Sequence, residues 1–228
     1  MLKNAGDIEI VPQPHVSVKH GRRAEKVKAK ILDAGERLFA FYGLEGVSLR
    51  QILIDAKQRN KYAISLYFGS KEDLVAAIVS RRIAEMNVHR RKLVAAAKEA
   101  GTYDRPRTVL EIIFRPLAEV SDSTGQYTYA RFLHQAMLYH SFSARWPLIR
   151  YEGEHSEANR RLRELAAGLS EDLFDSLLAV IAGIFLSAIT ARGLRVMEGR
   201  SVVPFDQFFP VLLDMATAAF EAALTAAR

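Results

Sequence analysis

The chain has 228 residues, of which half are apolar and a quarter are charged, with 12 Phe, 8 Tyr and 1 Trp. This composition is that of a folded protein with a substantial core, and it excludes global disorder. Because the chain contains no cysteine, disulfide frameworks, thiolate metal sites and cysteine nucleophiles are excluded. A reducing cytoplasm, which is the location we expect, is permitted by this composition but not proved by it.

The positive charge is concentrated in the N-terminal part. Residues 1–92 contain 18 Lys and Arg against 10 Asp and Glu, a net of +8, whereas residues 93–228 contain 14 against 16, a net of −2. Lys and Arg bind polyanions by releasing counterions from the phosphates, so the first 92 residues are the expected polyanion-binding part. From charge alone, a solvated basic surface without a partner is an equally good interpretation.

No segment predicts secretion or a membrane span. The N-terminus lacks the apolar core of a signal peptide, and the longest apolar stretch, 177–189, is shorter than the ~20 residues that cross a bilayer. We interpret this stretch as a buried helix and expect no membrane contact.

The chain begins with a predicted flexible basic arm, residues 1–22, which contains two prolines and no helical period. From about Val27 to Phe41, apolar residues recur at helical spacing, and Gly43 follows where a C-terminal cap belongs. We therefore predict a first helix of about four turns.

Two serines then mark helix starts. Ser48 with Gln51 fits a capping box, and Ser70 with Asp73 opens a second helix over 71–99. Between them, residues 58–68 have room for one short helix whose polar side is rich in Arg, Asn and Lys. A short helix, a turn and a short polar helix form the helix-turn-helix pattern, whose second helix enters the major groove of DNA.

The remainder also predicts helices only, because no stretch alternates as a strand does. Prolines stand near the predicted starts and glycines near the ends. The expected fold is all-α, with helices at about 106–120, 126–141, 147–167, 171–197 and 205–226.

The segment from Ile31 to Val79 resembles the DNA-binding domain of the TetR family. The matching residues are ILDAGERLFAFYGLEGVSLRQI, then Ala56, then FGSKEDL at 68–74. The match is similar in particular to members with a motif close to AGQRNxSAVxYHFGSK. The resemblance implies a three-helix DNA-binding domain over 23–84 and a helical effector-binding and dimerisation domain over 85–228.

The sequence departs from this motif in the turn and the second helix. Lys57 replaces the usual turn Gly, Tyr62 replaces a small residue, and Leu66 and Tyr67 stand where an aromatic residue and His are commoner. A Lys in a left-handed turn has a steric cost unless the turn is reshaped.

Residues 59–62 are the candidates for reading bases, because Arg can bind guanine bidentately and Asn can pair with adenine. Other polar residues suit phosphate contacts, with Ser48 serving as a helix cap in the alternative interpretation. The full candidate set for DNA is Ser48, Arg50, Arg59, Asn60, Lys61, Tyr62, Ser65, Tyr67 and Lys71.

The C-terminal part contains enough aromatic and apolar side chains to line an effector cavity between helices, although any one of them can instead be ordinary core. The candidates for contact with a lipophilic small molecule are Phe114, Tyr127, Phe132, Met137, His140, Trp146 and Phe174.

Helices 171–197 and 205–226 carry apolar stripes that suit close packing. In relatives of this type the last two helices form the dimer interface, and burial within one chain is the alternative. The stripe residues are Leu173, Leu177, Val180, Ile184, Ala188 and Ala191, followed by Phe208, Leu212, Met215, Ala219 and Phe220.

An enzyme is disfavoured. Glu152 and His155 have the spacing used in di-iron bundles but lack a second copy, and Glu85 with His89 suits a solvated pair. We find no phosphate loop or nucleophile motif and expect no cofactor and no bound metal. The expected function is a repressor that an effector releases from a palindromic operator; the alternatives are a DNA-binding module without a ligand, or a helical metal-binding enzyme.

Overall fold

The computed structural model describes residues 18–120, 126–139 and 153–226, and this part of the chain is helical without a strand, as expected. Its helices are α1 (Val18–Tyr42), α2 (Leu49–Asp55), α3 (Ala63–Tyr67), α4 (Lys71–Glu99), α5 (Pro106–Glu119), α6 (Thr128–Met137), α9 (Gly153–Leu165), α10 (Glu171–Met197) and α11 (Phe205–Ala226).

The start of α1 corrects the predicted arm. The helix begins at Val18, so residues 18–22 are helical rather than part of a flexible arm, and the helix is longer than the four turns predicted from Val27. The extra turns are polar and basic and include a 2.9 Å ion pair between Lys28 and Glu25. Residues 21–26 of these turns have no large apolar side chain, so no hydrophobic period indicated them.

Serine caps position the other helices. Both predicted capping boxes are confirmed: Ser48 accepts from the amide of Gln51, and Ser70 accepts from the amide of Asp73. Helices α4, α10 and α11 have the predicted bounds, and α6 and α9 are shorter than expected within the described residues.

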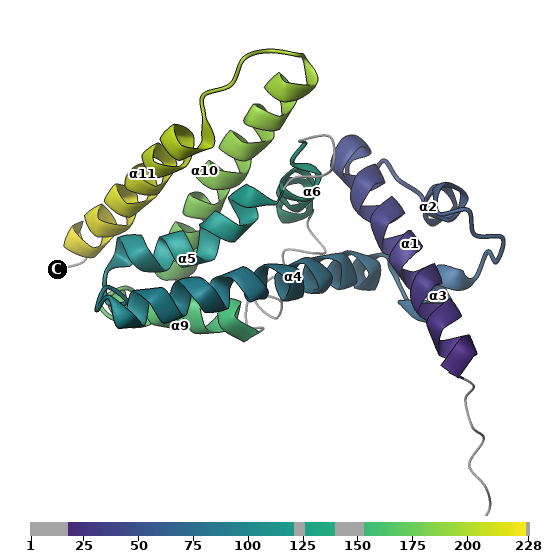
Figure 1. Cartoon of the computed structure of the whole chain (residues 1–228), viewed down its shortest axis with the longest axis horizontal. Coiled ribbons are helices and arrows are strands. Elements are labelled where there is room, and N and C mark those ends of the chain that lie inside the picture. The colour runs from purple at the N-terminus through teal and green to yellow at the C-terminus, as the bar shows by residue number, and fades with distance from the viewer. Residues whose placement is uncertain (1–17, 121–125, 140–152, 227–228) are drawn as a thin grey trace, which may run out of the picture.

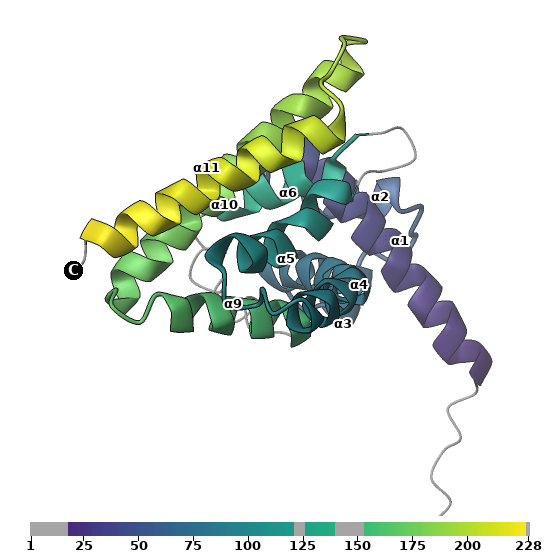
Figure 2. The ribbon, with the colours of Figure 1, turned by 60° about the vertical axis from the view of Figure 1, so that its left-hand side comes forward.

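Helix α4 is the long central element (Figure 1). At one end, α1 crosses it and carries α2 and α3 on its outer side; further along, α5 and α9 pack against it. Helix α6 lies between α1 and α10, and α11 packs on α5 and α10 (Figure 2). Because α4 is continuous across residues 84 and 85, it joins the two predicted domains.

A charged cluster and a close helix contact join α1 to α4. The buried Glu36 carboxylate accepts from Arg82 at 2.7 and 2.8 Å and from Arg81 at 3.3 Å. These hydrogen bonds raise the pKa of Arg82 further above its ordinary value. A Cβ at Gly35 would lie only 3.2 Å from Ile78, so this glycine permits the close approach of the two helices.

Helices α10 and α11 are less buried than their composition predicts. Both are long and apolar enough to cross a membrane, by length and composition only, which corrects the expectation that no segment could. A third of the most apolar window of each is buried in the protein. The predicted buried helix at 177–189 is therefore only partly buried, and Val180 within it is exposed.

The exposed stripe of α11 also differs from the predicted one. Leu212 and Phe220 belong to the core, where Phe220 is almost fully buried. Met215 of the predicted stripe is exposed, and further outward positions are 211, 218 and 222, of which Val211 is a large apolar residue. Periodicity indicated an amphipathic helix but assigned two core residues to its outer face.

Candidate nucleic-acid interface and effector cavity

Helices α2 and α3 are held by a small apolar core that leaves their polar sides in solvent. Ile52 and Leu53 of α2 and Ala63 and Ile64 of α3 are buried. The predicted anchor Phe68 is half-buried and packs against the same core. Because α3 has only five residues, its orientation depends on these contacts and on the turns at both ends.

The turn after α2 keeps the left-handed conformation despite its lysine. Lys57 has φ 54°, and it is the non-glycine residue with positive φ in the described part of the chain. Its amide donates to the Ile54 carbonyl at 3.0 Å, and the amide of Gln58 donates to that of Leu53 at 2.8 Å. The turn is therefore not reshaped around the lysine, and the steric cost expected of it is retained.

Residues 60–62 form a second turn that leads into α3. The amide of Tyr62 donates to Asn60 Oδ1 at 3.0 Å, and Ser65 Oγ donates to the Tyr62 carbonyl at 3.0 Å. This side-chain turn fixes Asn60 ahead of the helix. A bidentate contact of Asn60 with adenine would therefore use the second lone pair of Oδ1 together with Nδ2.

The structure brings the predicted base-reading residues together on one exposed surface. Arg59, Asn60, Lys61, Tyr62 and Ser65 are all exposed, and the ammonium of Lys61 lies 4.9 Å from the ring centroid of Tyr62. We call these five residues the recognition surface.

Sequence reasoning did not include Leu66 in this surface. Its side chain is 68% exposed, next to Tyr62 at 63%. An exposed leucine on this helix suits contact with a thymine methyl group. Its position in the sequence could have indicated this, because Leu66 is not one of the anchor positions 63, 64 and 68 that pack against the core.

The predicted phosphate-contact residues differ in whether they already contact other groups of the protein. Arg50 is exposed at the start of α2, whereas Ser48 acts as the helix cap. Tyr67 is half-buried, with Lys28 at 5.9 Å from its ring centroid. Lys71 donates to the Val47 carbonyl at 2.7 Å, and burial lowers its pKa.

A separate cavity of about 60 Å³ lies between α4, α5, α6 and α10. Phe114 and Met137, two of the predicted effector residues, line it. Sequence reasoning missed Arg90 and Tyr129, which are also in its wall. Helical periodicity identifies buried positions, but it cannot show that a buried Arg and Tyr face the same space.

The other predicted effector residues lie elsewhere. Phe132 is core, 6.2 Å from Phe39 between ring centroids, and Phe174 packs under Arg163 at 5.2 Å. Neither lines the cavity, because helix packing turned each toward a neighbouring helix. His140 and Trp146 lie outside the described residues.

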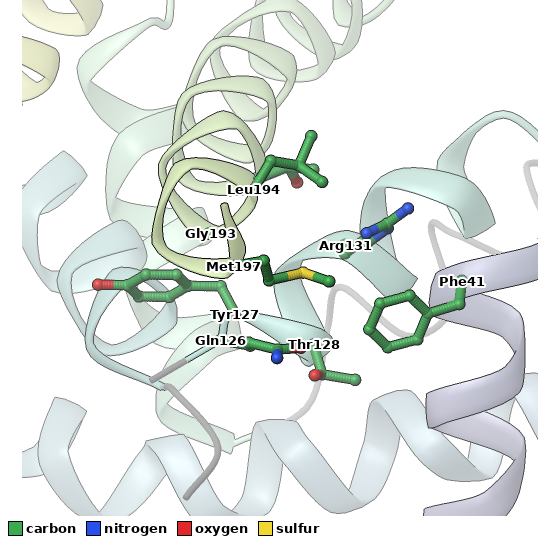
Figure 3. A pocket seen from close by; sticks show the side chains of 9 residues that line it. Phe41, Gln126, Tyr127, Thr128, Arg131, Gly193, Leu194 and Met197 are labelled. Carbon is green, nitrogen blue, oxygen red and sulfur yellow. The ribbon is translucent and has the colours of Figure 1, made fainter. Parts of the chain in front are cut away.

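Tyr127 lines a different and smaller space of about 10 Å³ where α1, α6 and α10 meet. Figure 3 shows Phe41 of α1 facing Arg131 of α6, with Met197 of α10 nearby. The Arg131 guanidinium lies 4.6 Å from the Phe41 ring centroid. This space can hold little more than one water molecule, so here Tyr127 contributes to packing between the two predicted domains.

In the described part of the chain, no side chains are arranged as the metal-binding enzyme interpretation requires. No group of three or more His, Asp or Glu side chains there could hold a metal ion. His89 pairs with Glu119 at 3.0 Å and Glu85 with Arg82 at 2.8 Å, so the supposed Glu85–His89 pair is divided between two other partners. Glu152 and the side chain of His155 lie outside the described residues.

Comparison with known families agrees with this geometry. The family model of the N-terminal domain of bacterial regulatory proteins of the tetR family matches residues 31–78. The comparison with curated proteins gives no match. The matched segment contains the second half of α1, α2, α3 and the start of α4, and the whole recognition surface lies within it. Residues 31–78 are therefore similar to the N-terminal DNA-binding domain of tetR-family regulators, which indicates that the chain is a DNA-binding transcriptional regulator.

Proposed function

We propose that this regulator is a homodimeric repressor that binds a palindromic operator and leaves it when a small molecule enters the cavity between α4, α5, α6 and α10. The observation that carries the DNA-binding part is the exposed recognition surface on a rigid support. In this proposal the DNA-binding domain spans residues 23–84 and the effector and dimerisation domain spans 85–228.

The bases are read by Arg59, Asn60, Lys61 and Tyr62. Beside them in α3 lie Ser65 and Leu66. The phosphates are contacted by Ser48, Arg50, Tyr67 and Lys71. A cap hydroxyl can serve both roles, whereas the bond of Lys71 to Val47 makes it the weakest member of this group. The net charge of +8 over residues 1–92 adds a salt-dependent attraction.

Dimer formation uses the exposed apolar residues of α10 and α11. Leu173, Val180, Val211 and Met215 are all exposed large apolar side chains on these two helices. Adjacent exposed apolar residues are typical of surfaces that a partner covers. A two-fold dimer presents two recognition surfaces, which explains a palindromic operator.

Coupling between cavity and DNA follows the course of α4. Its first turn is capped by Ser70 beside α3, and its buried Met86 and Arg90 line the cavity. A ligand that binds one position of α4 better than another shifts the population of conformations and hence the separation of the recognition surfaces.

The test of base reading is fluorescence anisotropy with a duplex that the wild-type protein selects from random DNA. Arg59→Ala is expected to raise Kd about fivefold or more, because a good bidentate base contact contributes about 1–3 kcal/mol. Tyr62→Ala removes an exposed ring and hydroxyl from the same surface and is expected to raise Kd as well. Arg105→Ala, an exposed arginine at the start of α5, is the matched control and should bind as the wild type does. Equal affinities for all four proteins would contradict the assignment.

The small cavity favours a second candidate, a DNA-binding regulator without a ligand. Ligand sites usually measure about 300–1,000 Å³, and here about 60 Å³ is present. A screen for small molecules that raise the melting temperature separates the two candidates, since only the effector-responsive regulator has a compound that both raises it and releases DNA.

A further inference from the structure

The first turns of α1 lie ahead of the segment that matches the family model. That segment begins at residue 31, whereas α1 begins at Val18. In both views these turns project beyond the other helices (Figures 1 and 2). A Cβ at Gly21 would meet no atom within 4 Å, which agrees with this open position. Most side chains of residues 21–30 are therefore accessible to a partner.

Four exposed cations gather on one side of these turns. Arg22, Lys26 and Lys30 follow one another at intervals of four residues, so they share one face of the helix over about 12 Å. Arg23 lies next to this face and is also exposed. In the described part of the chain, none of the four pairs with a carboxylate. We call these four residues the α1 basic stripe.

The α1 basic stripe is unfavourable for the helix alone. Like charges one turn apart repel each other, and positive charge near the N-terminus of a helix opposes its dipole. The first turn of α1 contains no acidic residue that would compensate. The exposed Arg107, by contrast, pairs with Asp214 at 2.8 Å. A bound anionic backbone would remove both costs.

Helix α1 passes the end of α3 at the level of the stripe. The ammonium of Lys28 lies 5.9 Å from the ring centroid of Tyr67, the last residue of α3, and it also pairs with Glu25 at 2.9 Å. Arg22 is six residues from Lys28, about 9 Å along the helix. A helix in the major groove has the DNA backbone beside its ends, so cations next to the end of α3 come close to phosphates.

We propose that the α1 basic stripe contacts phosphates of double-stranded DNA on the flank of the half-site that the recognition surface reads. This inference rests on the proposed operator binding and adds a second contact surface to it. Because phosphate contacts carry no base information, the stripe sets the affinity and its salt dependence but not the sequence preference. Each cation that neutralises a phosphate adds about 0.9 to the slope of log affinity against log salt.

The first test compares two variants that lose the same charge. The stripe variant combines Arg22→Gln, Arg23→Gln and Lys26→Gln, since glutamine is a good helix former without charge. The control variant combines the same change at three exposed cations of the C-terminal part, Lys92→Gln, Arg105→Gln and Arg160→Gln.

Affinity for the selected duplex is measured by fluorescence anisotropy at several salt concentrations. The salt slope of the stripe variant is expected to fall by about 2 to 3, and its Kd at ~0.1 M salt to rise at least tenfold. The control variant should keep the wild-type slope. Equal slopes for the stripe and control variants would overturn the inference.

The second test locates the contact on the DNA. Each protein is titrated with the selected base pairs alone and with the same base pairs between random flanks. Removing the flanks should weaken the wild type and the control variant severalfold and change the stripe variant little. If the loss of the flanks weakens all three proteins equally, the stripe does not contact them.

Failure of this inference can be distinguished from failure of the proposed function. If the wild type selects no sequence, base reading fails, and a salt slope on random duplex that depends on the stripe would still support the phosphate contact. If the wild type selects a sequence and the stripe and control variants behave alike, base reading stands and the stripe is only a solvated surface.

Discussion

At the residue scale, Lys57 shows how the helix-turn-helix tolerates a departure from its usual turn. Its φ of 54° lies in the left-handed region, which disfavours a side chain with a Cβ by about 1 kcal/mol. Lys57→Gly is expected to raise the free energy of unfolding in urea by about this amount. Lys57→Ala keeps the Cβ and should change little; equal stability of Lys57→Gly and the wild type would show that the turn is not strained.

Gly46 makes a close approach that sequence reasoning did not predict. A Cβ there would lie 2.4 Å from the carbonyl oxygen of Tyr42, a backbone atom that cannot move aside. Gly46→Ala is therefore expected to destabilise the chain by about 2 kcal/mol or more in urea denaturation. Gly21→Ala, where nothing lies within 4 Å of the new Cβ, should raise stability by up to about 1 kcal/mol. A neutral Gly46→Ala would contradict this account of the turn.

At the scale of the elements, α10 and α11 differ from ordinary core helices in what they expose. Val211 on α11 is 58% exposed, and Val88 on α4 is 53% exposed. If α11 lies in a dimer interface, Val211→Glu places a charge in that interface and should convert the dimer to a monomer in sedimentation equilibrium. Val88→Glu makes the same change outside the proposed interface and should leave the dimer intact. A dimer that tolerates Val211→Glu would exclude this use of the helix.

Most elements could be predicted from the sequence, and the misses have physical causes. The serine caps and the apolar periods indicated α2, α4, α10 and α11, because capping and amphipathic burial are local signals. The start of α1 was wrong because residues 21–26 have no large apolar side chain to mark a helical period. The outward face of α11 was wrong in part because Leu212 and Phe220 were assigned to the outer stripe, although the exposed Asp214 and Glu221 mark the solvent side of the helix.

At the scale of the whole molecule, the two candidate sites differ in how many of their residues could be predicted from the sequence. The recognition surface is contiguous over residues 59–65, so local pattern was enough to place it. The cavity combines α4, α5, α6 and α10, and pairing Arg90 with Tyr129 depends on how these helices pack. Of the residues predicted for an effector, Phe114 and Met137 line that cavity, while Phe132 and Phe174 pack elsewhere.

The two sites also predict one behaviour of the complete protein. A dimer with a recognition surface on each subunit should bind two half-sites related by a two-fold axis, about one helical turn of DNA apart or a multiple of it. Its affinity should fall steeply with salt, because the proposed phosphate contacts lie in the N-terminal part, which has a net charge of +8 over residues 1–92.

Selection of bound sequences from random duplex DNA at near-physiological salt tests this claim most directly. The account predicts that the full-length protein enriches one palindromic sequence, and that Arg59→Ala loses the preference at a symmetrically related base pair in each half-site. Binding that disappears with salt and enriches no sequence would contradict it, because the recognition surface would then contact only the backbone of DNA.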